Sequence, residues 1–354
     1  MEEAWDALTG FESRDLISRY FKKHHGIEAN AGKVQEIAAS FRLGREYFKS
    51  ASTSNIAVKP LLLYYGVLSL SRALILIFSP NLREDALKPS HGLGVKNWPS
   101  ALASKDFASL QIVIQNGTFS ELLTAVDNKT YFRAKSNKVD WRISYLQPSK
   151  GQTFNFYALS AGFPDLKREL QLWSNNAYVH AEVSDIDRNH EGNMVITSYL
   201  RGDIENDISA LFPNCTIHHE PGSVKIAATI SGDTNPLRLV PSWEGGMSFA
   251  SIGDVNIVPP FEHSENVCEI GQYFASAYIM GMMVRYYPTH WVALSRTEKG
   301  DAVYPLMLKL VKQIEYYFPR IVIDHLDYPY DFEIEQVKKL IAEEGLNEGK
   351  NLKE

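Results

Sequence analysis

Arg285 and His290 are the side chains in this sequence whose types and spacing best suit chemistry on a phosphodiester. The residue before Pro288 is biased away from the helical conformation, so we expect Arg285 at the end of one helix and His290 in the first turn of the next. A neutral histidine can take the proton of a ribose 2′-hydroxyl, and an arginine stabilises the charge that grows on the phosphate. Because a helix N-terminus disfavours imidazolium, His290 would stay available as a base. The pair predicts RNA cleavage without a metal or another cofactor.

This spacing of arginine and histidine is not specific. It recurs at Arg19 and His24 and at Arg320 and His325, and chance alone is expected to produce about one such pair in a chain of this composition. The alternative interpretation is that Arg285 only caps and orients a helix junction together with its histidine.

Polar residues also interrupt the most apolar stretch of the chain, residues 57–78. At 100° per residue, Tyr65 and Arg72 fall within a narrow arc of a helix, and Lys59 opens that helix, where a charged amine needs a partner or a ligand. Tyr65 and Arg72 could instead satisfy each other or a neighbouring carboxylate.

Residues 81–100 are predicted to form one long loop, and such loops are usually functional or mobile. His91 lies in this loop between flexible residues, where a ligand could draw it in. The residues that we expect to bind substrate are Lys59, Tyr65, Arg72 and His91.

A metal site on the central part of the chain is a further alternative. His180 and Glu182 share one face of a predicted strand, and mixtures of histidine and carboxylate can bind a divalent metal. A solvated strand face followed by an acidic turn explains the same residues, so we predict no metal. Walker, GxGxxG, GxSxG and HExxH motifs do not occur in the sequence.

Composition and charge indicate a globular protein with a sizeable core. The chain has 354 residues, 45% of them hydrophobic and 22% charged, and its net charge of −6 argues against a broad electrostatic grip on nucleic acid. The two cysteines, Cys215 and Cys268, lie far apart and suggest a reducing compartment. The acidic first residues contain no apolar segment of the signal-peptide kind, and Lys59 and Arg72 break the longest apolar run. We expect a soluble cytoplasmic protein that does not enter a membrane.

Hydrophobic periodicity predicts helices near both ends and strands between them. Strands are expected from Leu110 through a hairpin turn at Asn116-Gly117, and then across most of residues 175–260 as a mainly antiparallel sheet. The predicted helices are 13–24, 33–50, 57–78, 119–126, parts of 153–173, 265–285 with Ser264 as its cap, one opening at Pro288, 302–318 and 332–344.

The expected fold class is α+β, in which N- and C-terminal helices pack into one helical core beside a central antiparallel sheet. Residues 61–78 and 270–284 are each apolar on nearly all sides, so each needs more partners than its neighbours supply, and we expect them to pack together. The predicted regions are an N-terminal helical region (1–100), a central α+β region (101–260) and a C-terminal helical region (261–354).

Three separated blocks of this chain stand out: Tyr47-Phe48 with KPLLLYYG (59–66), His91-Gly92-Leu93, and RYYPTHW (285–291). Together they resemble the YaaC-like family of bacterial proteins, and the resemblance spans roughly residues 40 to 320. It implies a bacterial cytoplasmic protein, some members of the family being placed among genes for defence against phage. It supplies no established catalytic residues.

Arg285 and His290 in addition resemble the R-x4–6-H motif of HEPN ribonucleases, although Tyr286 stands where those enzymes usually have a polar amide or acid. Such sites are usually shared across a two-fold axis, so the resemblance implies a homodimer, for which the small residues Ala275, Ala277 and Gly281 could supply a contact.

The function predicted from the sequence is an intracellular anti-phage defence component acting as a metal-free HEPN-like endoribonuclease on RNA. One alternative is a non-catalytic, partner-binding scaffold subunit of a defence complex, for which paired tyrosines such as Tyr64-Tyr65 and Tyr286-Tyr287 could form a stacking surface. The other alternative is a metal-dependent enzyme that uses the central sheet.

Overall fold

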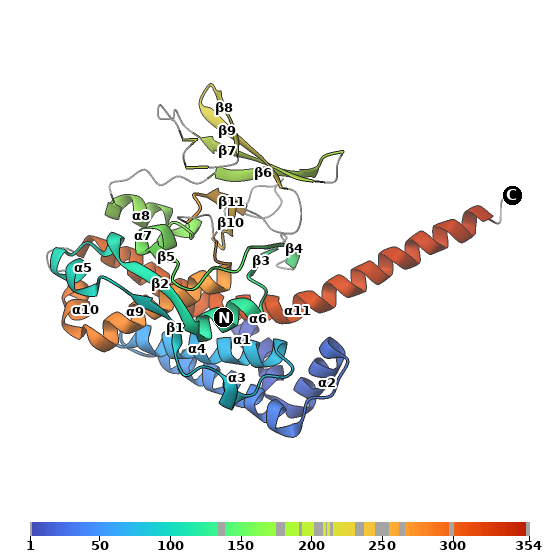
Figure 1. Cartoon of the computed structure of the whole chain (residues 1–354), viewed down its shortest axis with the longest axis horizontal. Coiled ribbons are helices and arrows are strands. Elements are labelled where there is room, and N and C mark those ends of the chain that lie inside the picture. Colours follow the sequence, from blue (N-terminus) through green and yellow to red (C-terminus); the bar gives the residue numbers. More distant parts are fainter. Residues whose placement is uncertain are drawn as a thin grey trace.

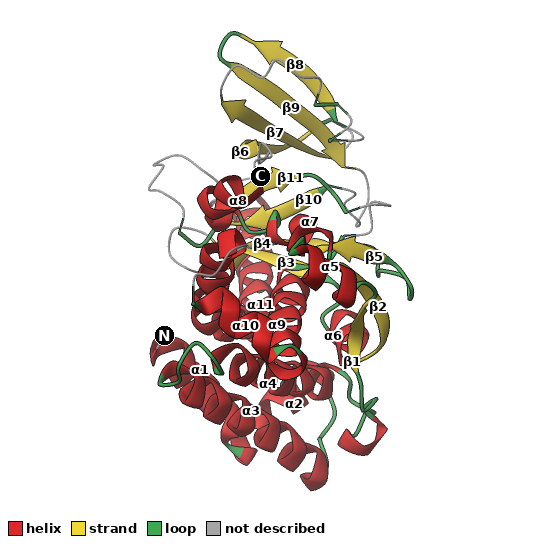
Figure 2. Cartoon of the chain, turned by 90° about the vertical axis from the view of Figure 1, so that its left-hand side faces the viewer, coloured by secondary structure: helices red, strands yellow, loops and turns green. Residues whose placement is uncertain are grey.

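A computed structural model of the chain describes residues 2–133, 139–174, 181–190, 193–201, 208–209, 211–212, 215–230, 237–244, 255–261, 266–296 and 301–351, with side chains at most of these positions up to residue 327. Helices gather at one end of the molecule and the largest antiparallel sheet lies at the other (Figures 1 and 2). Both termini contribute helices to the same layer, so the predicted α+β fold class is confirmed.

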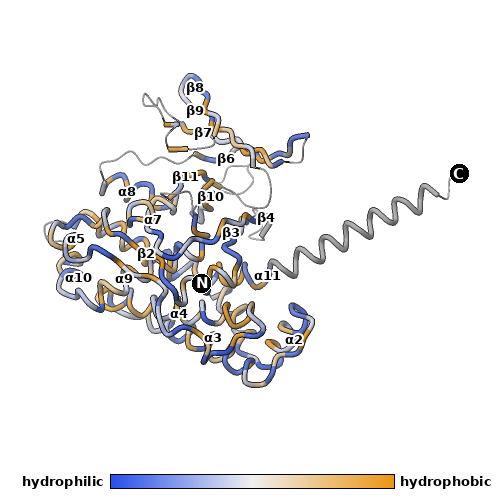
Figure 3. The backbone as a smooth tube through the Cα atoms, in the orientation of Figure 1, coloured by the Kyte–Doolittle hydropathy of each residue, from blue (hydrophilic) through white to orange (hydrophobic). Residues whose placement is uncertain are grey.

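The N-terminal helices begin where the sequence supplies a cap. Ser13 accepts a hydrogen bond from the Leu16 amide, and Asn30 accepts one of 2.8 Å from the Lys33 amide. Pro60 occupies the first turn of the next helix. Hydrophilic and hydrophobic residues alternate along α2 and α3 (Figure 3). These helices are α1 (Glu2–Thr9), α2 (Arg14–His25), α3 (Ala31–Ser52) and α4 (Lys59–Phe78).

The segment after α4 corrects two predictions. Residues 81–100 are not one loop, because His91–Val95 forms strand β1, which pairs antiparallel with β2 (Gln111–Gly117). Asn116-Gly117 is not a hairpin turn, because Gly117 instead caps the start of α6 (Thr118–Ala125). A glycine-rich segment is typical of a loop, but here Gly92 and Gly94 allow β1 to lie close to β2. The other elements of this part are α5 (Trp98–Ser104), β3 (Lys129–Arg133), β4 (Val139–Ser144), β5 (Thr153–Asn155), α7 (Phe156–Ser160) and α8 (Lys167–Ser174).

The predicted antiparallel sheet is present as six strands in the order β10-β11-β6-β7-β9-β8. Of the two smaller sheets, β3-β4 lies between the large sheet and the helices, and β1-β2-β5 runs along the side of the helical part (Figure 2). The expected strand at 247–252 and the Ser264 cap lie outside the residues that the structure describes. The strands of the large sheet are β6 (Ala181–Arg188), β7 (Met194–Arg201), β8 (Thr216–Glu220), β9 (Ser223–Ile230), β10 (Arg238–Pro241) and β11 (Val255–Val258).

The C-terminal helices are α9 (Glu269–Tyr286), α10 (Pro288–Ser295) and α11 (Tyr304–Asn351). The prediction of two helices at 302–318 and 332–344 is wrong, because α11 runs on through Pro319. Phe318 and Val322 on either side of this proline are fully buried, and their packing outweighs the one backbone hydrogen bond that proline removes. Short 3₁₀ turns are η1 (Gly10–Glu12), η2 (Glu84–Ala86), η3 (Phe107–Ser109), η4 (Pro164–Leu166) and η6 (Asp301–Val303).

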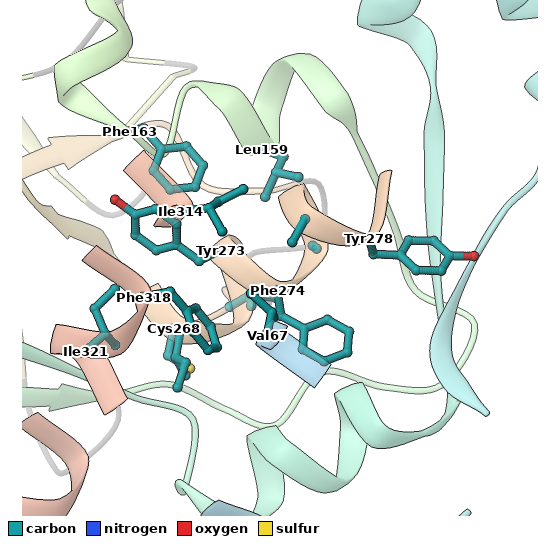
Figure 4. Close-up of a cluster of buried hydrophobic side chains, with 14 of the residues drawn as sticks. Val67, Leu159, Phe163, Cys268, Tyr273, Phe274, Tyr278, Ile314, Phe318 and Ile321 are labelled. Carbon is teal, nitrogen blue, oxygen red and sulfur yellow. The ribbon is translucent and has the colours of Figure 1, made fainter. Parts of the chain in front are cut away.

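The predicted contact between the two apolar segments is confirmed, because α4 packs directly on α9. A Cβ added to Gly281 would lie 2.7 Å from the Cβ of Tyr64, so only glycine allows this approach. Ala275 and Ala277 are also buried inside the chain, so the small-residue face expected to form a dimer contact is already covered. In Figure 4, Val67 of α4, Phe274 of α9 and Phe318 of α11 meet in one hydrophobic cluster.

Helix α4 is long and apolar enough to cross a membrane, but 67% of its most apolar window is buried inside the protein. Val67, Leu70 and Leu74 are fully buried, and burying each such side chain contributes about 1.5–3 kcal/mol to folding. The apolar character of α4 is therefore accounted for by its place at the centre of the core.

Candidate functional site

Arg285 lies at the C-terminal end of α9, where its side chain leaves the core and becomes exposed. Its guanidinium donates a hydrogen bond of 3.0 Å to the hydroxyl oxygen of Tyr65 on α4. The ring of Tyr65 stacks on Tyr47, and the ring of Tyr286 lies 5.1 Å from the guanidinium carbon. Two predicted site residues, Arg285 and Tyr65, are therefore in direct contact.

His91 reaches the same region because strand β1 begins with a bulge. The register of β1 on β2 shifts between His91 and Leu93, and Gly92 between them has a φ of +77°. A Cβ on Gly92 would lie 2.7 Å from the backbone nitrogen of Phe119. The bulge therefore requires glycine, and it sets the direction in which the His91 side chain leaves the strand.

The His91 ring lies among tyrosines from both central helices. Its Nδ1 is 2.5 Å from the hydroxyl oxygen of Tyr64, and its ring centroid is 5.7 Å from that of Tyr278. Figure 4 shows the Tyr278 hydroxyl pointing away from the hydrophobic cluster. We call this set the Arg285 cluster; its members are Tyr64, Tyr65, His91, Tyr278 and Arg285.

Burial sets the protonation state of the Arg285 cluster. It lowers the pKa of His91, and the nearby positive charge of Arg285 lowers it further, so the imidazole is neutral at pH 7. Burial raises the pKa of Tyr64 and raises that of Tyr278 to about 12, so both phenols keep their protons. The cluster therefore holds a single positive charge surrounded by neutral hydrogen-bonding groups, an arrangement that suits an anionic ligand.

His290 lies in the first turn of α10, as predicted, and its side chain is exposed. The helix is held by Trp291, which is fully buried and donates a 3.1 Å hydrogen bond to the carbonyl of Ile56. Among the contacts of the residues that the structure describes, Arg285 bonds to Tyr65 and not to His290. Joint action of Arg285 and His290 stays a prediction.

Lys59 and Arg72 have their contacts away from the Arg285 cluster. The Lys59 amine donates a 2.8 Å hydrogen bond to the carboxylate of Glu315 on α11, and both side chains are largely buried. Arg72 lies 4.0 Å from the carboxylate of Glu84. Each cation thus has a carboxylate partner within the chain. For Arg72 this agrees with the alternative interpretation of the sequence, in which a neighbouring carboxylate satisfies the arginine.

The alternative metal site receives no geometric support from the part of the chain that is described. Glu182 is exposed on β6, and His180 lies outside the described residues. Within the described ranges, no group of three or more histidine, cysteine or acidic side chains could hold a metal ion.

A second polar cluster, which sequence reasoning missed, is buried between β3, α9 and α11. The guanidinium of Arg133 bonds to Asp324 and lies 3.5 Å from a carboxylate oxygen of Glu269. Trp243 donates a 2.7 Å hydrogen bond to Glu269, and its ring stands 3.5 Å from the carbon of the guanidinium. These residues come from distant segments and share no spacing, so no sequence pattern marks them. Their mutual contacts indicate a role in joining the elements.

The pKa values in this second cluster follow from burial. Burial raises the pKa of Glu269 to about 7, against the opposing effect of the Arg133 charge. It lowers the pKa of His325, the neighbour of Asp324, to about 3, and the Arg133 and Lys129 charges act in the same direction. His325 is therefore a neutral core residue whose ring packs edge-on against Tyr131.

Fold and site together define an α+β protein with a helical core, a large antiparallel sheet, and a cationic cluster where α4, α9 and β1 meet. The model of the YaaC-like protein family matches residues 9–326, and the chain belongs to that family. No curated protein and no solved structure matches the chain significantly.

Proposed function

We propose that this protein binds RNA through a phosphate group at the Arg285 cluster and cleaves it without a metal, as an intracellular component of bacterial defence against phage. The observation that carries the proposal is the exposed Arg285 guanidinium, which is held by Tyr65 beside a neutral His91. The defence role comes from the family resemblance alone.

In this mechanism Arg285 stabilises negative charge on the phosphate. Its bond to Tyr65 fixes one edge of the guanidinium and leaves other N–H groups for the ligand. His290, whose side chain is exposed in the first turn of α10, takes the 2′-hydroxyl proton. The 2′-oxygen attacks the phosphorus to give a 2′,3′-cyclic phosphate while the bond from phosphorus to the 5′-oxygen breaks, and the His290 imidazolium returns its proton to that leaving oxygen. A pre-oriented cation and a general base are the two groups that such a transfer needs.

The test is incubation of the purified chain with RNA, with and without EDTA, followed by gel analysis. We expect cleavage that survives EDTA and is lost in Arg285→Ala and in His290→Ala. Matched controls are Arg42→Ala and His218→Ala, which remove exposed side chains on α3 and β8. Equal cleavage by all four variants, or none by the wild type, would overturn the nuclease assignment.

A non-catalytic, partner-binding role is the second candidate, and Tyr286 favours it. This tyrosine is 58% exposed beside Arg285, and tyrosine and arginine are the residue types that most often dominate protein interfaces. A wild type that binds RNA or a partner protein but leaves RNA intact would place this function first.

A further inference from the structure

We infer that Tyr64 is a positioning residue that fixes His91 with its proton on Nε2, so that His91 donates a hydrogen bond to an anionic oxygen and is not the general base of the Arg285 cluster. The identity of the anion, a phosphate, rests on the proposed function. The tautomer of His91 is inferred from its contact with Tyr64 and does not depend on the proposed function.

The first step is the direction of the bond between Tyr64 and His91. Tyr64 is fully buried, and a buried hydroxyl that donates to nothing costs about 1–3 kcal/mol. Among the residues that the structure describes, the acceptor within reach of this hydroxyl is Nδ1 of His91, at 2.5 Å. Tyr64 therefore donates and Nδ1 accepts. In a neutral imidazole the proton must then be on Nε2.

The second step is the charge of His91. The groups that face it are Tyr64 on α4 and Tyr278 and Arg285 on α9, all of them neutral phenols or a cation. No carboxylate from the described part of the chain contacts the ring to favour imidazolium. His91 is thus neutral, and the opposite tautomer would leave the buried Tyr64 proton without an acceptor.

The third step is what the cluster offers a ligand. The oxygen of Tyr65 accepts from Arg285, so its own proton is free to be donated. Together with Nε2–H of His91 and the remaining N–H groups of Arg285, the cluster presents donors and no strong acceptor. That set matches the oxygens of a phosphate. Proton abstraction must then be carried out by another residue, which separates the role of His91 from that of His290.

The direct test is two-bond ¹⁵N–¹H correlation on the full chain labelled with ¹⁵N-histidine at pH 7. The His91 signals are assigned by their loss in His91→Gln. We expect a protonated Nε2 and an unprotonated Nδ1 in the wild type, and a mixture of tautomers in Tyr64→Phe, which keeps the ring and removes the hydroxyl. Tyr278→Phe is the matched control and should leave the tautomer unchanged. Protonated Nδ1 in the wild type, or no change in Tyr64→Phe, would overturn the inference.

Binding of inorganic phosphate tests the donor role. His91→Gln keeps an N–H donor near the position of Nε2 and should bind phosphate within about threefold of wild type, whereas His91→Ala should lose about tenfold or more. Equal losses in both variants would refute a donor role. If the tautomer is as stated but RNA is neither bound nor cleaved, the proposed function fails and the positioning role of Tyr64 stands.

Discussion

The hydroxyl of Tyr65 on α4 accepts a 3.0 Å hydrogen bond from the guanidinium of Arg285 on α9, across 220 residues of sequence. This bond spans the pair of helices that forms the centre of the core. It gives the exposed cation a fixed orientation, because the tyrosine is itself held by stacking on Tyr47. The helix pair at the centre of the core thus supports the group proposed to meet the phosphate.

Removal of the Tyr65 hydroxyl should therefore weaken anion binding more than folding. In Tyr65→Phe we expect phosphate affinity to fall about three- to tenfold, and the free energy of unfolding to change by less than about 1 kcal/mol, since the bond is solvent-exposed. Isothermal titration with phosphate and urea denaturation measure the two effects. Tyr47→Phe removes a hydroxyl from the same stack and should leave affinity unchanged. Equal loss in both variants would contradict an orienting role for the Tyr65 bond.

Lys59 should behave as a structural residue. The side chains of Lys59 and Glu315 are 17% and 11% exposed, so Lys59→Met leaves the carboxylate of a largely buried side chain without its cation. We expect a loss of about 1–3 kcal/mol in the free energy of unfolding, with RNA cleavage and phosphate affinity retained by the folded protein. The double variant Lys59→Met/Glu315→Leu should recover much of the stability. A folded Lys59→Met that has lost phosphate binding would restore Lys59 to the site.

The central helix pair was predictable because its signal is local. Helices α4 and α9 are each apolar on nearly every face. Two such helices bury most of their apolar surface when they pack against each other. Periodicity also identified Tyr65 as a polar interruption of α4. The contact of Tyr65 with Arg285 could not be predicted, because it depends on the register in which the two helices pack.

The placement of His91 was missed for a different reason. Gly92 and Gly94 flank Leu93, and glycine-rich sequence is typical of loops. In the fold these residues form strand β1, and its partner β2 comes only after an intervening helix. The strand is therefore determined by pairing with a distant segment, which no local sequence pattern shows. The second polar cluster, around Arg133, was missed likewise, since its carboxylates and tryptophan meet only through tertiary packing.

Acid should destabilise the protein through His325. Its pKa falls from an ordinary 6.5 to about 3 in the fold, so between these values the unfolded chain binds more protons than the folded one. The contribution of His325 to stability is therefore complete above pH 6.5 and is lost as the pH falls toward 3. In His325→Phe, which keeps an aromatic ring against Tyr131, we expect a smaller drop in melting temperature between pH 7 and pH 5.

Glu269 should act with the opposite sign in the same experiment. Its pKa rises from 4.5 to about 7 on folding, so the folded chain binds more protons between those values, and acidification stabilises it there. Glu269→Gln removes this compensation, and its melting temperature should fall more steeply than that of wild type between pH 7 and pH 5. Parallel curves for wild type, His325→Phe and Glu269→Gln would show that neither residue is buried in solution as it is in the structure.

The bulge at Gly92 gives the sharpest test of how His91 is placed. An alanine at this position must adopt a φ of +77° and would put its Cβ 2.7 Å from the Phe119 nitrogen and 2.9 Å from the Gly117 carbonyl carbon, both of them backbone atoms. The strained backbone alone costs on the order of 1–3 kcal/mol, and the contacts require β1 to shift.

Gly92→Ala should therefore lose about 2 kcal/mol or more of stability and move His91 away from Tyr64, with weaker phosphate binding as the second consequence. Gly94→Ala is the matched control on the same strand. Its Cβ would meet the end of the flexible Gln115 side chain at 2.7 Å and the Cγ1 of Val113 at 3.2 Å, both of them side-chain atoms, and its backbone is not in the left-handed region. Urea denaturation measures the stability of both variants, and phosphate titration measures their affinity for the anion. Equal effects at Gly92 and Gly94 would mean that β1 carries His91 without the bulge.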